Sequence, residues 1–204
     1  MRGCCLGVVL LIVLLGLSAF VVDRALAAPN LGAAPGGSDD GETQVAIAVS
    51  LGAQLARQLL TQPHGVVTLS EHDLTVLARE HNPHPDRLRN VVARVRDGFL
   101  LLSALTDYGP LTVTVVAHVG VDLQPGGGRL DAKVVSVDVG DLQLPGFLQD
   151  HVVGSPTISL DQLFTSPALQ VLRANIECVV VAPDGLRVGV HRPGTAASPS
   201  VCGA

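Results

Sequence analysis

Hydrophobic and polar residues alternate along the middle of the chain in a pattern that predicts long β-strands. The clearest run holds apolar residues at every second position: Leu111, Val113, Val115, Ala117, Val119, Val121 and Leu123. Side chains two residues apart share one face of a strand, so this run predicts an aliphatic face about 40 Å long. Shorter runs predict strands at 66–69, 90–96, 98–105 and 129–139. The alternation slips at Val134-Val135, which predicts a β-bulge there.

Apolar residues spaced three and four apart predict helices around these strands. One helix is expected at 44–60, and another begins after Ser70, where Ser70 and Asp73 have the spacing of a capping box. Two further helices are expected at 146–153 and 159–172, and Pro183-Asp184-Gly185 predicts the turn of a terminal β-hairpin. The fold class is therefore α+β: a long, curved antiparallel sheet, made of a meander and the C-terminal hairpin, with helices packed on one face.

The N-terminal segment is the most hydrophobic part of the chain. Gly3 to Val22 carries no charged side chain, and a helix of this length rises about 30 Å, the thickness of a bilayer's hydrocarbon core. The weak excess of basic residues on its N-terminal side favours export of the C-terminal remainder of the chain. The segment fits an uncleaved single-pass anchor, and Ala25-Leu26-Ala27 before Ala28 also fits a signal-peptide cleavage site. Both alternatives place the remainder outside the cytoplasm, at the cell membrane or secreted after cleavage.

The chain divides into four parts by composition. Residues 1–28 form the anchor or signal peptide, and 29–43, rich in Gly, Pro and Asp, form a flexible linker. Residues 44–192 are long enough for one extracytoplasmic domain, and 193–204 are expected to be a coil tail. A net charge of -5 and 2% aromatic residues provide neither the basic field nor the stacking platforms that nucleic-acid binding uses.

Few residues offer chemistry. Cys178 and Cys202 are the only cysteines beyond the leader, and an exported domain permits a disulfide between them; two free thiols are the alternative. The histidines His64, His72, His81 and His84 lack the spacing and partners of a metal site. The sequence Ser70-Glu71-His72-Asp73 contains a serine, a histidine and acids, but neighbours on a helix project about 100° apart, which indicates a helix cap. We therefore expect no enzyme, no cofactor and no metal.

Three stretches resemble the YpmS-like proteins and, more loosely, the LmeA-like proteins of actinobacteria. They are VTLSEHDLTVLA at 67–78, the strand pair around Asp97-Gly98, and the strand region 111–145, which closes with Gly140-Asp141-Leu142-Gln143-Leu144-Pro145. Both families are bacterial proteins with an N-terminal membrane segment and an extracytoplasmic domain. The resemblance implies a domain related to tubular lipid-binding folds, in which helices and a curved sheet enclose an apolar channel, and it brings no catalytic residues.

Two functions from different classes are compatible with these features. The first is a membrane-tethered domain that binds or handles lipid by burying acyl chains between helix and sheet, with a phospholipid or another acyl lipid as ligand. The lipid-facing candidates are Leu111, Val113, Val115, Val119, Val121, Leu142 and Leu144. The alternative is a non-catalytic interaction module of the cell envelope, which would bind a partner protein through a sheet edge or the terminal hairpin.

Overall fold

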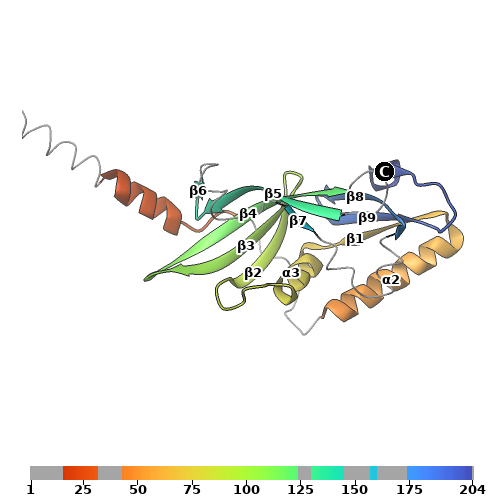
Figure 1. The fold of residues 1–204 in the computed structure, drawn as a ribbon, viewed down its shortest axis with the longest axis horizontal. Helices are drawn as coiled ribbons and strands as arrows, with labels where there is room; N and C mark the ends of the chain where they lie inside the picture. Colours follow the sequence, from red (N-terminus) through yellow and green to blue (C-terminus); the bar gives the residue numbers. More distant parts are fainter. Residues whose placement is uncertain (1–15, 32–42, 124–129, 145–156, 160–173, 204) are drawn as a thin grey trace, which may run out of the picture.

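Two antiparallel sheets follow one another along the long axis of the molecule (Figure 1). The computed structural model describes residues 16–31, 43–123, 130–144, 157–159 and 174–203. The larger sheet has the order β2 (Arg89–Arg96), β3 (Phe99–Tyr108), β4 (Leu111–Leu123), β5 (Leu130–Val139) and β6 (Leu142–Gln143), and β7 (Thr157–Ser159) also pairs with β5. The smaller sheet has the order β1 (His64–Leu69), β9 (Gly185–His191) and β8 (Ile176–Ala182).

Helices flank both sheets. They are α2 (Gln44–Thr61), α3 (Glu71–Glu80) and the short 3-10 helix η2 (Pro199–Gly203), and residues 16–26 are also helical. The expected cap is present on α3, where Ser70 and Asp73 bond each other's backbone N–H groups. In the described part of the chain, no helix is both long and apolar enough to cross a membrane. The expected span, 3–22, lies mostly outside that part.

The α+β class and the antiparallel meander are confirmed, and the expectation of one sheet is wrong. The C-terminal hairpin β8–β9 does not extend the meander, because β9 pairs with the whole length of β1, from His64 opposite His191 to Leu69 opposite Leu186. The bulge is confirmed: His118 pairs with Ser136 and Val119 with Val134, which leaves Val135 as the extra residue.

Two expectations concern segments near the C-terminus. The helix expected at 146–153 lies outside the described residues, as does the second helix from 160 onward; Ser159, its first expected residue, ends strand β7. The tail from 193 is not coil throughout, since 199–203 form η2 and Cys202 is buried there.

Strand β4 connects two hydrophobic clusters. At its C-terminal end, Leu123 packs on the cluster beneath α2, which is formed by Leu55, Val67, Ile176 and Val190. Two residues earlier in β4, Val121 packs on the cluster beneath α3, which is formed by Leu74, Ala93, Val95 and Leu186. Val179 of β8 contacts both clusters, so the two sheets share an interior at this end of β4.

Candidate functional site

The larger sheet has one face that carries almost only aliphatic side chains; we call it the apolar face. Strand register aligns its residues in rows across the strands. The rows are Val95–Leu100–Val119–Val134, then Ala93–Leu102–Ala117–Val137, then Ala104–Val115–Val139–Leu142, then Thr106–Val113, and finally Tyr108–Leu111 at the tip of the β3–β4 hairpin. Polar side chains appear only in the last two rows.

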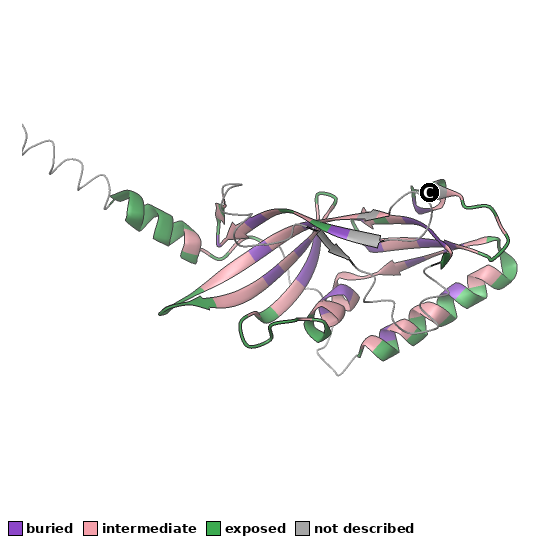
Figure 2. Cartoon of the chain, in the orientation of Figure 1, coloured by how far each residue is buried: buried purple, intermediate pink, exposed green. Residues whose placement is uncertain are grey.

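Burial on the apolar face is greatest at its inner end and least at the hairpin tip (Figure 2). At the inner end Val119 is 2% exposed, and α3 and the smaller sheet pack on the β2 and β3 residues of the first two rows. Val115 and Val113 are half-buried, and Leu111 at the tip is 39% exposed. The face is therefore a closed core at one end and open at the other.

The structure separates the seven lipid-facing candidates into two groups. Val119 belongs to the closed core, and Val121 packs on the cluster beneath α3. Four others lie at or beyond the third row and keep partial exposure: Leu111, Val113, Val115 and Leu142. Leu144 is also partly exposed, but it lies beside Val137 of the second row. Leu144 follows the short strand β6 and is held through its backbone N–H, which donates to the carbonyl of Val137 at 3.1 Å.

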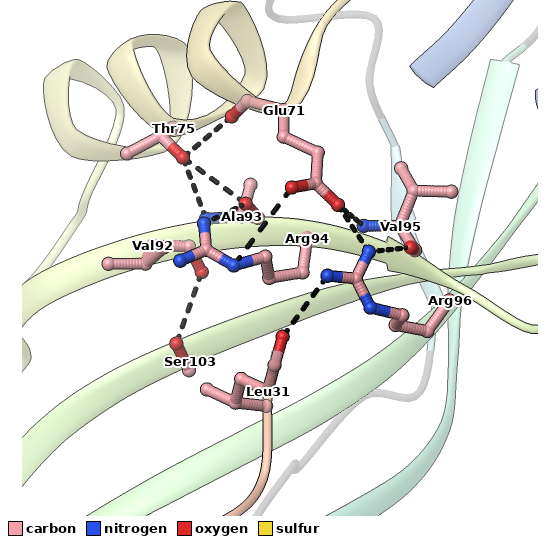
Figure 3. Close-up of polar contacts among 9 residues, drawn as sticks. All are labelled: Leu31, Glu71, Thr75, Val92, Ala93, Arg94, Val95, Arg96 and Ser103. Atoms are coloured by element: carbon pink, nitrogen blue, oxygen red, sulfur yellow. Dashed lines mark hydrogen bonds and ion pairs between the residues drawn. The ribbon is translucent and has the colours of Figure 1, made fainter. Parts of the chain in front are cut away.

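Helix α3 closes the outer edge of β2 with polar side chains (Figure 3). The hydroxyl of Thr75 accepts a hydrogen bond from the Ala93 N–H at 3.0 Å and donates to the Glu71 carbonyl at 2.7 Å. Two residues further along β2, the Glu71 carboxylate accepts a hydrogen bond from the Val95 N–H at 2.7 Å. An edge strand buried without such partners would leave its N–H groups unsatisfied, so these two side chains replace the missing neighbouring strand.

The Glu71 carboxylate also binds Arg94 and Arg96 (Figure 3). These two arginines alternate with Ala93 and Val95 along β2, so they lie on the face of the sheet opposite the apolar face. Arg96 donates from Nη1 to Glu71 Oε1 at 2.7 Å and from Nη2 to the Leu31 carbonyl at 3.3 Å. Arg94 is 5% exposed, and its Nε lies 4.0 Å from Glu71 Oε2. Desolvation lowers the pKa of Arg94, the charge of Glu71 raises it, and Arg96 lowers it again. Glu71 is therefore the counter-charge that makes burial of Arg94 tolerable.

The face opposite the apolar face contains further polar groups between Leu101 and Val116. His118 Nε2 lies 2.8 Å from Asp138 Oδ2, and the Phe99 ring meets the His118 ring edge-on. Asp138 Oδ1 and Arg94 Nε are the two buried side-chain atoms in the described part of the chain that have no hydrogen-bond partner. This face is a buried mixture of polar and apolar side chains and is unlike the aliphatic surface behind it.

The other sequence candidates have structural roles. Cys178 and Cys202 are joined by a disulfide with an S–S distance of 2.10 Å, which fixes η2 onto β8. His64 contacts the buried Glu177 at 3.0 Å, far along the chain from His81, whose ring bonds the Leu77 carbonyl. Within the described residues, no group of three or more His, Cys, Asp or Glu side chains could hold a metal.

Sequence reasoning missed the residues around the β2 edge. Thr75 has the helical spacing of an ordinary surface residue, and Arg94 alternates with apolar neighbours as an exposed strand residue would. The available signal was the pair of arginines, Arg94 and Arg96, in a strand that follows a helix opening with Glu71. Opposite charges on successive elements could have indicated that the helix lies along the strand.

A scan against protein-family models, a search of curated proteins and a search of solved structures each return no match for this chain. The fold and the apolar face are therefore interpreted from their own geometry.

Proposed function

We propose that this domain binds acyl lipids on the open part of its apolar face while its leader holds it at the extracytoplasmic side of a membrane. The observation that carries the proposal is the loss of burial along an aliphatic surface. Where an antiparallel sheet faces water, its exposed side normally carries polar residues. Here the partly exposed positions hold Val113, Val115 and Leu142, which favours an apolar ligand over water.

The chemistry of the face also indicates the class of ligand. Each methylene that moves from water to such a surface contributes about 0.8 kcal/mol. Covering ten methylenes would supply about 8 kcal/mol, against which the cost of association must be set. The open rows are mostly aliphatic and carry no charged side chain, so they favour hydrocarbon and leave the headgroup unspecified; a phospholipid or another acyl lipid fits. The resemblance to tubular lipid-binding folds implies the same class of ligand.

Contacts at the end of the leader support tethering without cleavage. Arg24 pairs with Asp141, and the Asp141 N–H donates to the Arg24 carbonyl at 2.9 Å. Arg24 precedes the expected cleavage point after Ala27, so cleavage would remove a residue that contacts the larger sheet. A retained leader keeps the domain beside the bilayer, where acyl lipids are the most abundant apolar ligands.

A matched pair of charge substitutions tests the proposal. Val113 and Thr114 are successive, half-buried residues of β4 and lie on opposite faces of the sheet. The full chain in non-ionic detergent is titrated with fluorescently labelled phospholipid, beside the variants Val113→Glu and Thr114→Glu. We expect Val113→Glu to weaken binding at least tenfold, about 1.4 kcal/mol, because a carboxylate would be placed against the acyl chain. Thr114→Glu should bind as the unsubstituted chain does.

Two outcomes would refute the proposal. Equal losses in both variants would mean that the apolar face is not the binding surface. No binding by the unsubstituted chain would favour the alternative function, a protein-interaction module of the cell envelope.

A further inference from the structure

The end of the N-terminal helix is fixed to the β5–β6 turn, close to the open end of the apolar face. Arg24 pairs with Asp141 and stacks over the Phe20 ring at 5.6 Å. Gly140 has φ +60°, and a Cβ there would meet the carbonyl oxygens of Arg24 and Ala25. The turn therefore accepts the helix end only because residue 140 is a glycine.

The same turn is bonded to β4 near the hairpin tip. The Gly140 N–H donates to the Thr114 carbonyl at 2.7 Å. Thr114 is three residues from Leu111, so the tip lies about 10 Å along the strand from the point where the helix ends. Figure 1 places the helix of residues 16–26 and the β3–β4 hairpin tip at the same end of the molecule, whereas the C-terminal end of α2 lies at the other.

The exposed side chains at this end are suited to a bilayer interface. Tyr108, the only tyrosine of the chain, is 80% exposed at the tip and pairs with Leu111. The adjacent charge, Asp107, is bonded by Arg89 at 2.6 Å and by the hydroxyl of Thr112 at 2.7 Å. On the helix, the exposed large apolar residues are Leu17, Phe20, Val21, Val22 and Leu26. A tyrosine ring has an apolar body and a polar end, which is why tyrosines gather at membrane interfaces.

We propose that the β3–β4 hairpin tip, 108–111, rests in the interface of the bilayer that holds the leader. We expect a lipid bilayer as the binding partner of this surface, because the uncharged stretch 3–22, which is long enough to span a bilayer, ends two residues before Arg24, and Arg24 is paired with Asp141 of the β5–β6 turn. The proposal rests on the tethering part of the proposed function and adds an orientation to it. The open rows of the apolar face then begin at the membrane, so an acyl chain can pass between bilayer and domain without crossing water.

The chain contains no tryptophan, so a single tryptophan can report on the depth of any chosen position. The full chain is reconstituted into phosphatidylcholine vesicles that contain lipids brominated at a known acyl depth. The probe is Tyr108→Trp, and the control is Leu60→Trp, at a position that is also 80% exposed but lies near the C-terminal end of α2. We expect bromolipid to quench the probe several-fold more than the control, together with a blue shift of its emission. Equal quenching at the two positions would overturn the proposal.

A second variant tests the contact that sets the orientation. Gly140→Ala, added to the Tyr108→Trp chain, would push Arg24 and Ala25 off the turn, and we expect it to reduce quenching toward the control level. Unchanged quenching in a folded Gly140→Ala chain would contradict the role of this contact. The two proposals can fail separately. If the chain binds labelled phospholipid but the probe is not quenched, the proposed orientation is wrong and the lipid site stands. If the probe is quenched but the chain binds no phospholipid, the lipid site is wrong and the orientation stands.

Discussion

Thr75 allows a quantitative test of how α3 closes the larger sheet. Its hydroxyl is the partner of the Ala93 N–H on the outer edge of β2, at a residue that is 0% exposed. Thr75→Val keeps the shape of the side chain and leaves this buried donor without a partner. A buried, unsatisfied backbone group costs about 1–3 kcal/mol, so we expect a loss of about 2 kcal/mol in the free energy of unfolding.

The assay is urea unfolding of the full chain in non-ionic detergent, followed by far-ultraviolet circular dichroism. With a slope of about 2 kcal/mol per molar urea, a loss of this size lowers the midpoint by about 1 M. Two controls isolate the hydroxyl. Thr75→Ser keeps it and should cost less than half as much, and Thr61→Val removes a hydroxyl from an exposed position in α2 and should change stability by about 0.5 kcal/mol or less. An unchanged midpoint in Thr75→Val, or a larger loss in Thr75→Ser, would refute the reasoning.

Three further predictions use the same unfolding measurement. Glu71→Ala removes the counter-charge of the buried Arg94 and should lower the free energy of unfolding by about 3 kcal/mol. Adding Arg94→Met should recover part of this loss, and simple additivity of the two changes would contradict the pairing. Cys202→Ser opens a loop with a sequence separation of 24, and loop-closure entropy predicts a loss of about 3 kcal/mol in the free energy of unfolding. Equal stability of the unsubstituted chain with and without a reducing agent would show that the disulfide does not constrain the unfolded chain. Val119→Ala in the closed core should cost about 2 kcal/mol, and Val113→Ala less than half of that; the reverse order would place the open part of the face in the core.

Local patterns were enough to predict most individual elements. The alternation from Leu111 to Leu123 matches the bounds of β4, and the slip at Val134-Val135 in the next run marks the bulge in β5. The cap at Ser70 and Asp73 was also predictable, because a helix start depends only on residues next to one another in the chain.

Features that depend on contacts between distant segments were not predictable in this way. Many strands here have similar Val and Leu alternation, so the pattern could not show that β9 pairs with β1 and not with the meander. Val119 was expected to face lipid because its spacing equals that of Val113. Only the packing of the folded chain distinguishes the two residues, because it buries Val119 and leaves Val113 partly exposed.

Arg94 shows the same limit for charged residues. An arginine that alternates with apolar residues normally indicates a solvated face, but here Glu71 reaches it from a separate element. The sequence could therefore identify the aliphatic face, and not which part of it stays open.

Native mass spectrometry of the full chain released from detergent micelles tests the central claim most directly. If the open rows of the apolar face hold an acyl lipid, the protein will carry an added mass equal to one lipid, and Val113→Glu will lose that added mass while Thr114→Glu keeps it. An apo mass for the unsubstituted chain, together with no uptake of labelled phospholipid, would contradict the account.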